Sequence, residues 1–292
     1  MMMLKTKQDV LDRLSDDLKL RSLSPHTRDY YFRRARFFQD YFDKPATELG
    51  VCDIREYLLH LSEEKGLAVG TVNAYNAAIR FLFNVTLNRP MNTAMIPMKP
   101  VVRHIPDILT RDEVKAMFDA CEGNLRDKCI LMVTYSAGLR VSEIAKLRVK
   151  DIDSLKMQLF IEKGKGRKDR FAILAETTLD TLREFWRKHR PKDYLFISRN
   201  KRPMSTRAIQ EVFHKYADRI GLTKNVTIHT LRHSFATHLL EDGVGIHKIK
   251  QLLGHKDIKS TYFYLRLLGI DELGVTSPLD KFVRDVGGDG DA

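Results

Sequence analysis

The chain has 292 residues and a formal net charge of +12, with 50 lysines and arginines against 38 acidic residues. This length allows about two domains, and 43% hydrophobic with 30% charged residues is typical of a folded globular protein rather than a disordered one. The longest apolar stretch, around residues 130–139, is too short to span a membrane. Three cysteines without a CxxC pair exclude a disulfide framework, and with no secretory signal they predict a reducing, cytoplasmic location.

The positive charge favours a polyanionic partner, with nucleic acid first. Residues 1–100 carry 15 basic and 12 acidic groups, whereas residues 160–202 alone carry 13 basic and 6 acidic groups. The basic excess therefore belongs mainly to the second part of the chain. Charge alone leaves the question open, because many basic proteins have no specific polyanionic partner.

The N-terminal part is predicted to be helical. Apolar residues at helical spacing indicate helices over about 9–20, 53–64 and 69–87. Ser24-Pro25 is a helix-start signal, with serine as the N-cap and proline in the first turn. No internal repeat is visible.

The helix that follows Pro25 interleaves aromatic residues with arginines. Two interpretations remain open: the aromatic residues form a core while the arginines are solvated, or the arginines form a face that binds DNA. In the second interpretation the candidate DNA-binding residues of this helix are Arg28, Arg33 and Arg34.

A proline-rich stretch follows. Four prolines within residues 88–106 prevent a continuous helix and indicate an interdomain linker. We therefore expect a helical domain over residues 1–90, a linker over 91–106, a second domain over 107–275, and a C-terminal segment over 276–292.

The second domain is predicted to mix helices with a small antiparallel sheet, which makes the chain mainly α overall. Thr110 and Glu113 form a capping box for a helix that ends near residue 121. Two β-like runs, 158–162 and 170–174, flank a basic turn with glycines and predict a hairpin. Further helices are expected at about 125–136, 176–188, 205–220, 229–241, 245–252 and 257–268.

Four segments of the second domain combine chemically reactive residues with turns or helical spacing. They are residues 137–147, with Arg140 at a helix start; the hairpin turn, with Lys165; His229-Thr-Leu-Arg-His233, with Arg232; and Leu253-Gly-His255, followed nine positions later by Tyr264. In the third segment, the spacing i, i+3, i+4 brings the histidines and the arginine near one face of a helix.

With these four segments in this order, the sequence resembles the tyrosine recombinases of the phage integrase type, over nearly the whole chain. It looks most like a minimal, Xer-like or transposon-encoded member. The resemblance implies a helical core-binding domain and an α+β catalytic domain that close on DNA as a C-shaped clamp. It further implies that Arg140 and Arg232 hold the phosphate and that Tyr264 is the nucleophile. Lys165 matches the hairpin lysine of the family, His229 the first histidine of its HxxR box, and His255 its later histidine.

The chemistry of these residues is consistent with that resemblance. Cleaving DNA without a metal ion requires a nucleophile, cations around the transition-state phosphate and an acid for the leaving oxygen. Guanidinium groups suit the cation role because they are planar and stay charged. Lys165 can reach the leaving 5′-oxygen, while His229 and His255 can hydrogen-bond phosphate oxygens, and His229 can also help to remove the tyrosine proton. Tyrosine, with an ordinary pKa of about 10, needs such cations to become a nucleophile.

Alternative roles exist for several neighbours. Tyr262 is a second tyrosine, but two helical residues lie about 200° apart, so only one faces the site, and the spacing from His255 favours Tyr264. His233 is expected to be a packed neighbour rather than a catalyst, and Glu143 to fix Arg140 or cap its turn.

The basic turn offers further candidates. Lys163 and Lys168 are alternatives to Lys165 as the acid, or they bind backbone phosphates together with Arg167. The two histidines of the HxxRH segment also have the spacing of a zinc pair, but Thr230 stands where HExxH needs its glutamate and no third ligand is evident. No metal or other cofactor is therefore predicted.

The resemblance implies a site-specific recombinase that acts in DNA integration, excision or resolution, in the cytoplasm of a bacterium or archaeon and near the nucleoid. Four protomers on two double-stranded sites would exchange strands through 3′-phosphotyrosyl intermediates and a Holliday junction. Two alternatives remain open: a type IB topoisomerase, which shares the chemistry but relaxes DNA as a monomer, and a non-catalytic DNA-architectural protein that keeps the fold. No membrane partner is expected.

The C-terminal segment contains one apolar stripe. Leu279, Phe282, Val283 and Val286 recur at i, i+3, i+4 and i+7, which predicts a short amphipathic helix that must dock on protein. Docking on its own domain and docking on a neighbouring protomer are both open, and the resemblance favours the neighbour. Residues 287–292 are expected to be disordered.

Overall fold

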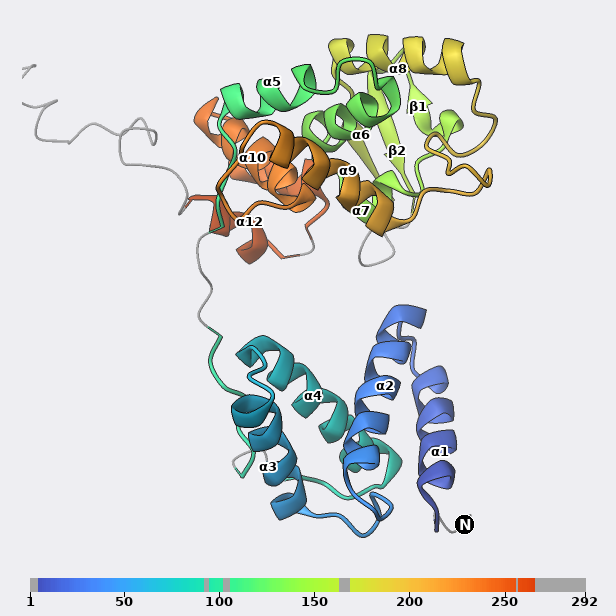
Figure 1. Cartoon of the computed structure of the whole chain (residues 1–292), viewed down its shortest axis with the longest axis vertical. Helices are drawn as coiled ribbons and strands as arrows, with labels where there is room; N and C mark the ends of the chain where they lie inside the picture. Colours follow the sequence, from blue (N-terminus) through green and yellow to red (C-terminus); the bar gives the residue numbers. More distant parts are fainter. Residues whose placement is uncertain (1–4, 92–94, 102–105, 163–168, 256, 266–292) are drawn as a thin grey trace, which may run out of the picture. The chain divides into compact units, whose positions relative to one another are not determined.

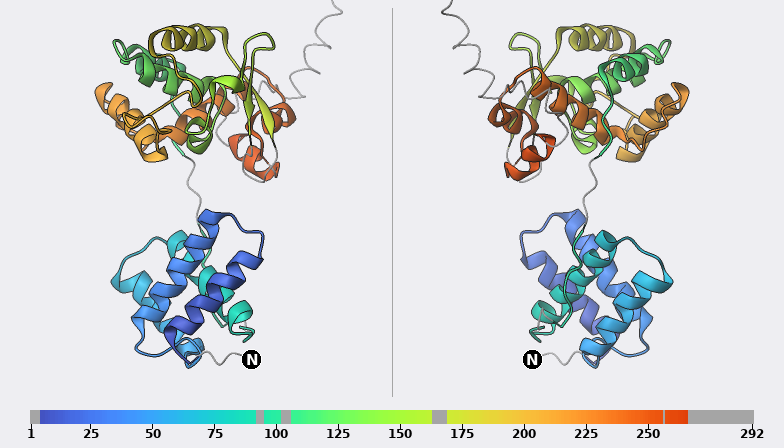
Figure 2. Two further views of the ribbon diagram at one scale, coloured as in Figure 1. Left: turned by 90° about the vertical axis from the view of Figure 1, so that its right-hand side faces the viewer. Right: turned by 90° about the vertical axis from the view of Figure 1, so that its left-hand side faces the viewer.

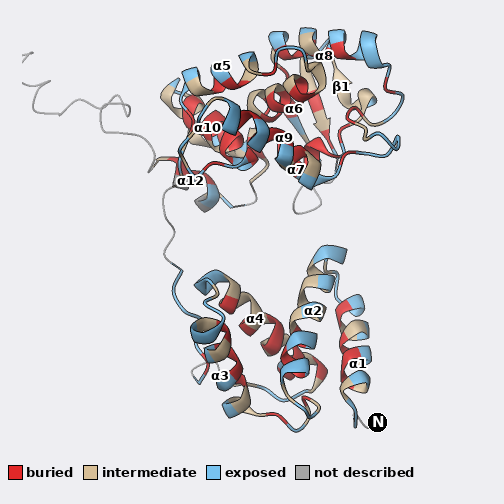
Figure 3. Ribbon diagram, viewed as in Figure 1, coloured by how far each residue is buried: buried red, intermediate tan, exposed pale blue. Residues whose placement is uncertain are grey.

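The computed structural model describes residues 5–91, 95–101, 106–162, 169–255 and 257–265. The chain divides into two compact units, Met1–Arg103 and His104–Ala292. Each unit has its own hydrophobic core. The buried residues lie along the inward faces of the helices within each unit (Figure 3).

The first unit is a small helical bundle. Its elements are α1 (Lys7–Leu20), α2 (Pro25–Tyr41), α3 (Val51–Leu59), η1 (His60–Glu64), α4 (Val69–Phe81) and η2 (Leu82–Thr86). Helix α2 packs between α1 and α4, and α3 packs against α4 (Figure 1). The predicted helix start at Ser24 is confirmed, because its side chain caps α2 by accepting a hydrogen bond from the Thr27 amide at 3.1 Å.

Two helix ends differ from the prediction. The expected helices over 53–64 and 69–87 each change from α-helix to a π-helical turn, η1 and η2, before they end. In these turns the amide of Lys65 donates to the carbonyl of His60, and that of Leu87 to Leu82, five residues back. Apolar spacing did not reveal this change, because it reports a buried face and not the hydrogen-bond register.

The second unit combines helices with the sheet (Figure 2). Its helices are α5 (Arg111–Asp119), α6 (Leu125–Ser136), α7 (Val141–Ile144), α8 (Glu176–His189), α9 (Thr206–Arg219), α10 (Ile228–Glu241), α11 (Ile246–Leu253) and α12 (Lys259–Leu265). For α7 only the start at Arg140 was predicted. The bounds of the other helices agree with the predicted ones to within about two residues, apart from the expected end at 268, which lies outside the described residues. The prediction of a mainly helical chain with a small antiparallel sheet is confirmed.

The described part of the sheet has the order β1 (Ile152–Asp153), β2 (Gln158–Ile161) and β3 (Arg170–Ile173), with both pairs antiparallel. The predicted hairpin is confirmed as β2 and β3, in which Ile161 pairs with Arg170 and Gln158 with Ile173. Strand β1 was not predicted, because two residues are too few for a visible alternation. A short 3₁₀ turn, η3 (Val149–Asp151), leads into β1. Helix α11 packs against β3 and brings the end of α11 next to the hairpin.

In the part of the chain that the structure describes, no helix is both long enough and apolar enough to cross a membrane.

Candidate active site

The turn between α6 and α7 fixes the position of Arg140. Gly138 has a φ of 58°, and a Cβ atom there would come within 2.5 Å of the Phe235 ring on α10. Only glycine therefore allows the turn to pack against α10. Arg140 is the N-cap residue of α7, and Glu143 accepts hydrogen bonds from its amide and from its Nη1, both at 2.9 Å. The expectation that Glu143 fixes Arg140 and caps the turn is confirmed.

Arg232 lies on α10 and is only 4% exposed. Its Nη1 donates to the carbonyl of Gly138, and its Nη2 donates to the carbonyl of Leu253 at 2.7 Å and to His255 Nε2 at 3.0 Å. Burial lowers the pKa of Arg232 to about 10, with the charge of Arg140 as a further cause. The guanidinium group therefore remains charged at neutral pH.

His255 follows the left-handed Gly254 that ends α11. Because an arginine can only donate, His255 Nε2 accepts from Arg232, and Nδ1 carries the proton that is shared with Thr261 Oγ1 at 2.9 Å. Burial lowers the pKa of His255 to about 3, and Arg232 and Arg140 contribute to this shift. The ring is therefore neutral at physiological pH, with one defined tautomer.

Tyr264 lies on α12 and is only 2% exposed, whereas Tyr262 is 49% exposed. The ring of Tyr264 is parallel to that of His255, with 6.1 Å between the centroids. Burial raises the pKa of Tyr264, while Arg232 and Arg140 act in the opposite direction. Of the two tyrosines, the one that the sequence analysis favoured is the one that faces the cluster.

The two histidines of α10 have different surroundings. His229 is accessible in the first turn of the helix, where desolvation by nearby protein atoms and the charges of Arg232 and Arg140 lower its pKa. His233 is more enclosed, and its Nδ1 lies 3.1 Å from the hydroxyl of Tyr264. Burial, followed by the influence of His229, lowers the pKa of His233 to about 4. The expectation of a packed His233 omitted this contact with the tyrosine oxygen.

One member of the cluster was missed in the sequence. Arg170 begins β3, and its guanidinium pairs with both carboxylate oxygens of Glu143, at 2.7 and 2.8 Å. A signal was available, because strand alternation places Arg170 on the same face as the buried Ala172. A cation on the buried face of a strand requires an acidic partner.

The structure does not describe the four predicted residues of the basic turn. Lys163, Lys165, Arg167 and Lys168 lie outside the described residues.

The three candidates on α2 belong to the first unit. Arg33 pairs with Asp29 at 3.0 Å, and Arg28 is half-buried. Arg34 stacks on the Tyr30 ring, 3.1 Å from its centroid, and donates to the carbonyl of Tyr30 at 3.3 Å. Arg34 is therefore held by its own helix, and DNA binding by these arginines remains a prediction.

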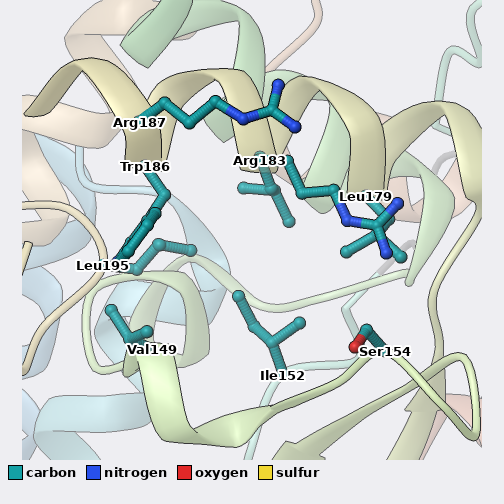
Figure 4. A pocket seen from close by; sticks show the side chains of 9 residues that line it. Val149, Ile152, Ser154, Leu179, Arg183, Trp186, Arg187 and Leu195 are labelled. Carbon is teal, nitrogen blue, oxygen red and sulfur yellow. The ribbon is translucent and has the colours of Figure 1, made fainter. Parts of the chain in front are cut away.

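A pocket of about 380 Å³ lies along α8, apart from this cluster (Figure 4). Leu179 and Trp186 of α8 face Val149 and Ile152 across it, and Leu182, Arg183 and Arg187 also line it. No candidate catalytic residue lines this pocket. Among the described residues, no group of three or more histidine, cysteine, aspartate or glutamate side chains is placed to hold a metal ion.

The cluster joins residues from distant segments of the second unit. Two arginines, a neutral histidine and a buried tyrosine hydroxyl meet where α10, α11 and α12 pack together, and Arg140 joins them from the start of α7. The structure therefore brings together four of the residues that the sequence analysis nominated, Arg140, Arg232, His255 and Tyr264.

Comparison with known proteins gives the family. Residues 107–268 match the phage integrase family, and residues 10–93 match the N-terminal SAM-like domain of phage integrases. The chain is 40% identical over 276 residues to y4qK of Sinorhizobium fredii, provisionally named an integrase/recombinase, covering 93% of this chain and 89% of that protein. It is 33% identical over 265 residues to the tyrosine recombinase XerA of Pyrococcus horikoshii, covering 89% of each. The chain belongs to the phage integrase family and is a tyrosine-type site-specific recombinase.

Solved structures of recombinases are also similar to this chain. The crystal structure of XerA recombinase matches with a TM-score of 0.54 and 26% identity, over 95% of this chain and 98% of that one. The structure of XerH bound to palindromic difH substrate, a post-cleavage complex, matches with a TM-score of 0.75 over 91% of this chain and 95% of that one. At 17% identity, the second match shows a shared fold alone. Together the comparisons favour site-specific recombination over DNA relaxation and over a purely architectural role.

Proposed function

We propose that Tyr264 attacks a DNA phosphodiester and forms a 3′-phosphotyrosyl bond, while Arg140 and Arg232 hold the phosphate. The observation that carries this proposal is the buried Tyr264 hydroxyl within one cluster with Arg232 and His233. The bond that breaks is the one between phosphorus and the 5′-oxygen. Because the phosphotyrosyl bond retains the energy of the phosphodiester, a 5′-hydroxyl can later rejoin the strand without ATP.

The arginines suit the trigonal-bipyramidal transition state. Guanidinium groups donate paired hydrogen bonds to phosphate oxygens and stay charged. Glu143 lies between them, 2.9 Å from Arg140 Nη1 and 4.0 Å from Arg232 Nη1, and so reduces the repulsion of two like charges. His255 accepts from Arg232 through Nε2 and donates to Thr261 through Nδ1, so it helps to hold the Arg232 guanidinium in place. Preorganised donors of this kind stabilise the charge that develops during the reaction.

Proton removal from Tyr264 has two candidates. The resemblance points to His229, which is accessible at the start of α10. The contact of 3.1 Å favours His233 as the first acceptor, because a neutral imidazole nitrogen can accept the hydroxyl hydrogen.

Lys165 is proposed as the acid that protonates the leaving 5′-oxygen. This proposal is supported by the position of strand β3, because Arg170 at its start binds Glu143 in the cluster. Lys165 is five residues from Arg170, and five residues of extended chain span at most about 17 Å. We propose that this length of chain lets the lysine side chain reach a phosphate held in the cluster.

The assembly is proposed from the family. Four protomers, each closed around DNA as a C-shaped clamp, would exchange strands on two sites through a Holliday junction, with the 279–286 segment docked on a neighbour. Structures with this fold include XerH bound to a difH substrate and a lambda integrase dimer bound to a core site, and these support double-stranded DNA as the partner. Integration, excision and resolution are the candidate outcomes, and the cytoplasmic location remains a prediction.

Covalent capture tests the proposal. The recognition site is first obtained by sequencing DNA fragments that become covalently attached to the wild-type protein, and is then prepared as a nicked suicide substrate. Tyr264→Phe should keep half-site affinity and lose the adduct, because only the nucleophilic oxygen is removed. Tyr262→Phe is the matched control and should cleave normally, and EDTA should have no effect. An adduct with Tyr264→Phe, and none with Tyr262→Phe, would refute the assignment.

A further inference from the structure

Arg170 connects three separate segments of the second unit. Its side chain is 9% exposed and extends from the start of β3 towards Glu143 of α7. Both terminal nitrogens donate to the Glu143 carboxylate, and Nε donates to the carbonyl of Leu252 at 3.0 Å. Each of the three nitrogens of the guanidinium group therefore has a defined partner.

The pairing with Glu143 sets the direction of Arg140. Two parallel hydrogen bonds from one guanidinium fix the plane of a carboxylate. The same two oxygens accept from the Arg140 amide and from Arg140 Nη1, both at 2.9 Å. Rotation of the carboxylate would break these bonds, so Arg170 orients Arg140 through Glu143.

The bond to Leu252 sets the position of His255. The last carbonyls of a helix have no donor within the helix. At the end of α11, Arg170 binds the Leu252 carbonyl and Arg232 binds the next one, that of Leu253. Gly254 then turns with a φ of 62°, and a Cβ there would lie 2.6 Å from Arg170 Cδ. The backbone just before His255 therefore lies directly on the Arg170 side chain.

We infer that Arg170 is a positioning residue for DNA cleavage, which aligns Arg140 through Glu143 and His255 through the end of α11. This inference rests on the proposed function. Arg170 also pairs with Ile161 at the last described rung of the hairpin before the turn that contains Lys165. The Arg170 side chain thus connects the hairpin to Arg140 through Glu143 and to His255 through the end of α11. A lysine cannot replace it, because an ammonium group lacks the planar set of donors.

Cleavage kinetics test the inference. Arg170→Ala should slow single-turnover adduct formation by about 10- to 100-fold, the scale expected for a misplaced reacting group, with half-site affinity nearly unchanged. Arg170→Lys should restore only part of the rate of adduct formation that Arg170→Ala loses. Arg148→Ala is the control, because Arg148 also pairs with a carboxylate, that of Asp193, but outside the cluster. Wild-type rates for Arg170→Ala, or equal losses for both alanine variants, would overturn the inference.

The pH profile separates positioning from a general loss of structure. Among the described residues, the charged groups that face Glu143 are Arg170, Arg140 and Arg232. Hydrogen bonds and charge from Arg170, and then from Arg140, lower the pKa of its carboxyl to about 2 against the effect of burial. Without Arg170 that pKa rises, so cleavage by Arg170→Ala should fall on the acid side of the profile. Adding Glu143→Gln should remove this acid limb, since glutamine does not titrate. A profile of unchanged shape in Arg170→Ala would contradict the mechanism.

A measurement without DNA keeps the two proposals distinguishable. Amide hydrogen exchange at residues 252–255 should become faster in Arg170→Ala than in wild type, and Arg148→Ala should not change it. If wild type forms no adduct but exchange responds as expected, the proposed catalytic function fails and the positioning contact stands. Unchanged exchange in Arg170→Ala overturns the positioning role itself.

Discussion

Replacing Glu143 by glutamine removes a buried negative charge that faces three arginines. The pKa of this carboxyl falls from its ordinary value of 4.5 to about 2, because hydrogen bonds and charge from Arg170 and Arg140 outweigh burial. A lowering of this size corresponds to about 3 kcal/mol of folding stability at neutral pH. Because the pKa is lower in the folded state, this stability is present above pH 4.5 and is lost as the pH falls towards 2.

The sequence contains one tryptophan, Trp186, and it lies on α8 in the same unit as Glu143. Urea unfolding followed by its fluorescence therefore reports on the catalytic unit of the full chain. The free energy of unfolding of the wild type should exceed that of Glu143→Gln by about 3 kcal/mol at pH 7 and by about 1 kcal/mol at pH 3. The other carboxyl groups titrate in both proteins, so their contributions cancel in the difference between the two unfolding free energies.

Glu113→Gln is the matched control. Glu113 pairs with Lys224 at 2.7 Å, but the two side chains are 25% and 34% exposed, so solvent screens this pair and the effect should be below about 1 kcal/mol. Glutamine also retains the capping-box role at this position. Equal stability of Glu143→Gln and wild type at pH 7, or a difference that does not change down to pH 3, would refute the reasoning.

Three further predictions concern the reaction. Arg140→Ala and Arg232→Ala should each slow adduct formation by at least roughly 100-fold, the scale for losing one transition-state donor, while half-site affinity falls far less; equal losses would make them ordinary phosphate contacts. Lys165→Ala should be slow on normal DNA and recover on a 5′-phosphorothiolate, whose sulfur leaves without a proton; no recovery would assign the acid role to another group. A chain that ends at Ser277 should bind a half-site but lose recombination, and Phe282→Ala should show part of that loss; wild-type recombination by the shortened chain would exclude docking on a neighbour.

Local patterns in the sequence were enough to predict the helices and the hairpin. The cap at Ser24 and the capping box of Thr110 with Glu113 depend on neighbours three residues away, and both occur as predicted. Motif order was also enough to nominate Arg232, His255 and Tyr264, because each lies in a short, recognisable segment. These features need only residues that are close in the chain.

The contacts inside the site needed the tertiary structure. Arg170 and Glu143 are 27 positions apart, and His233 and Tyr264 are 31 apart, so no local pattern pairs them. A buried charge or hydroxyl requires a partner, but any of many acids, carbonyls or imidazoles along the chain would satisfy that requirement. The packing of β3 against α11 and of α10 against α12 selects these partners, because only folding brings their side chains within hydrogen-bond distance.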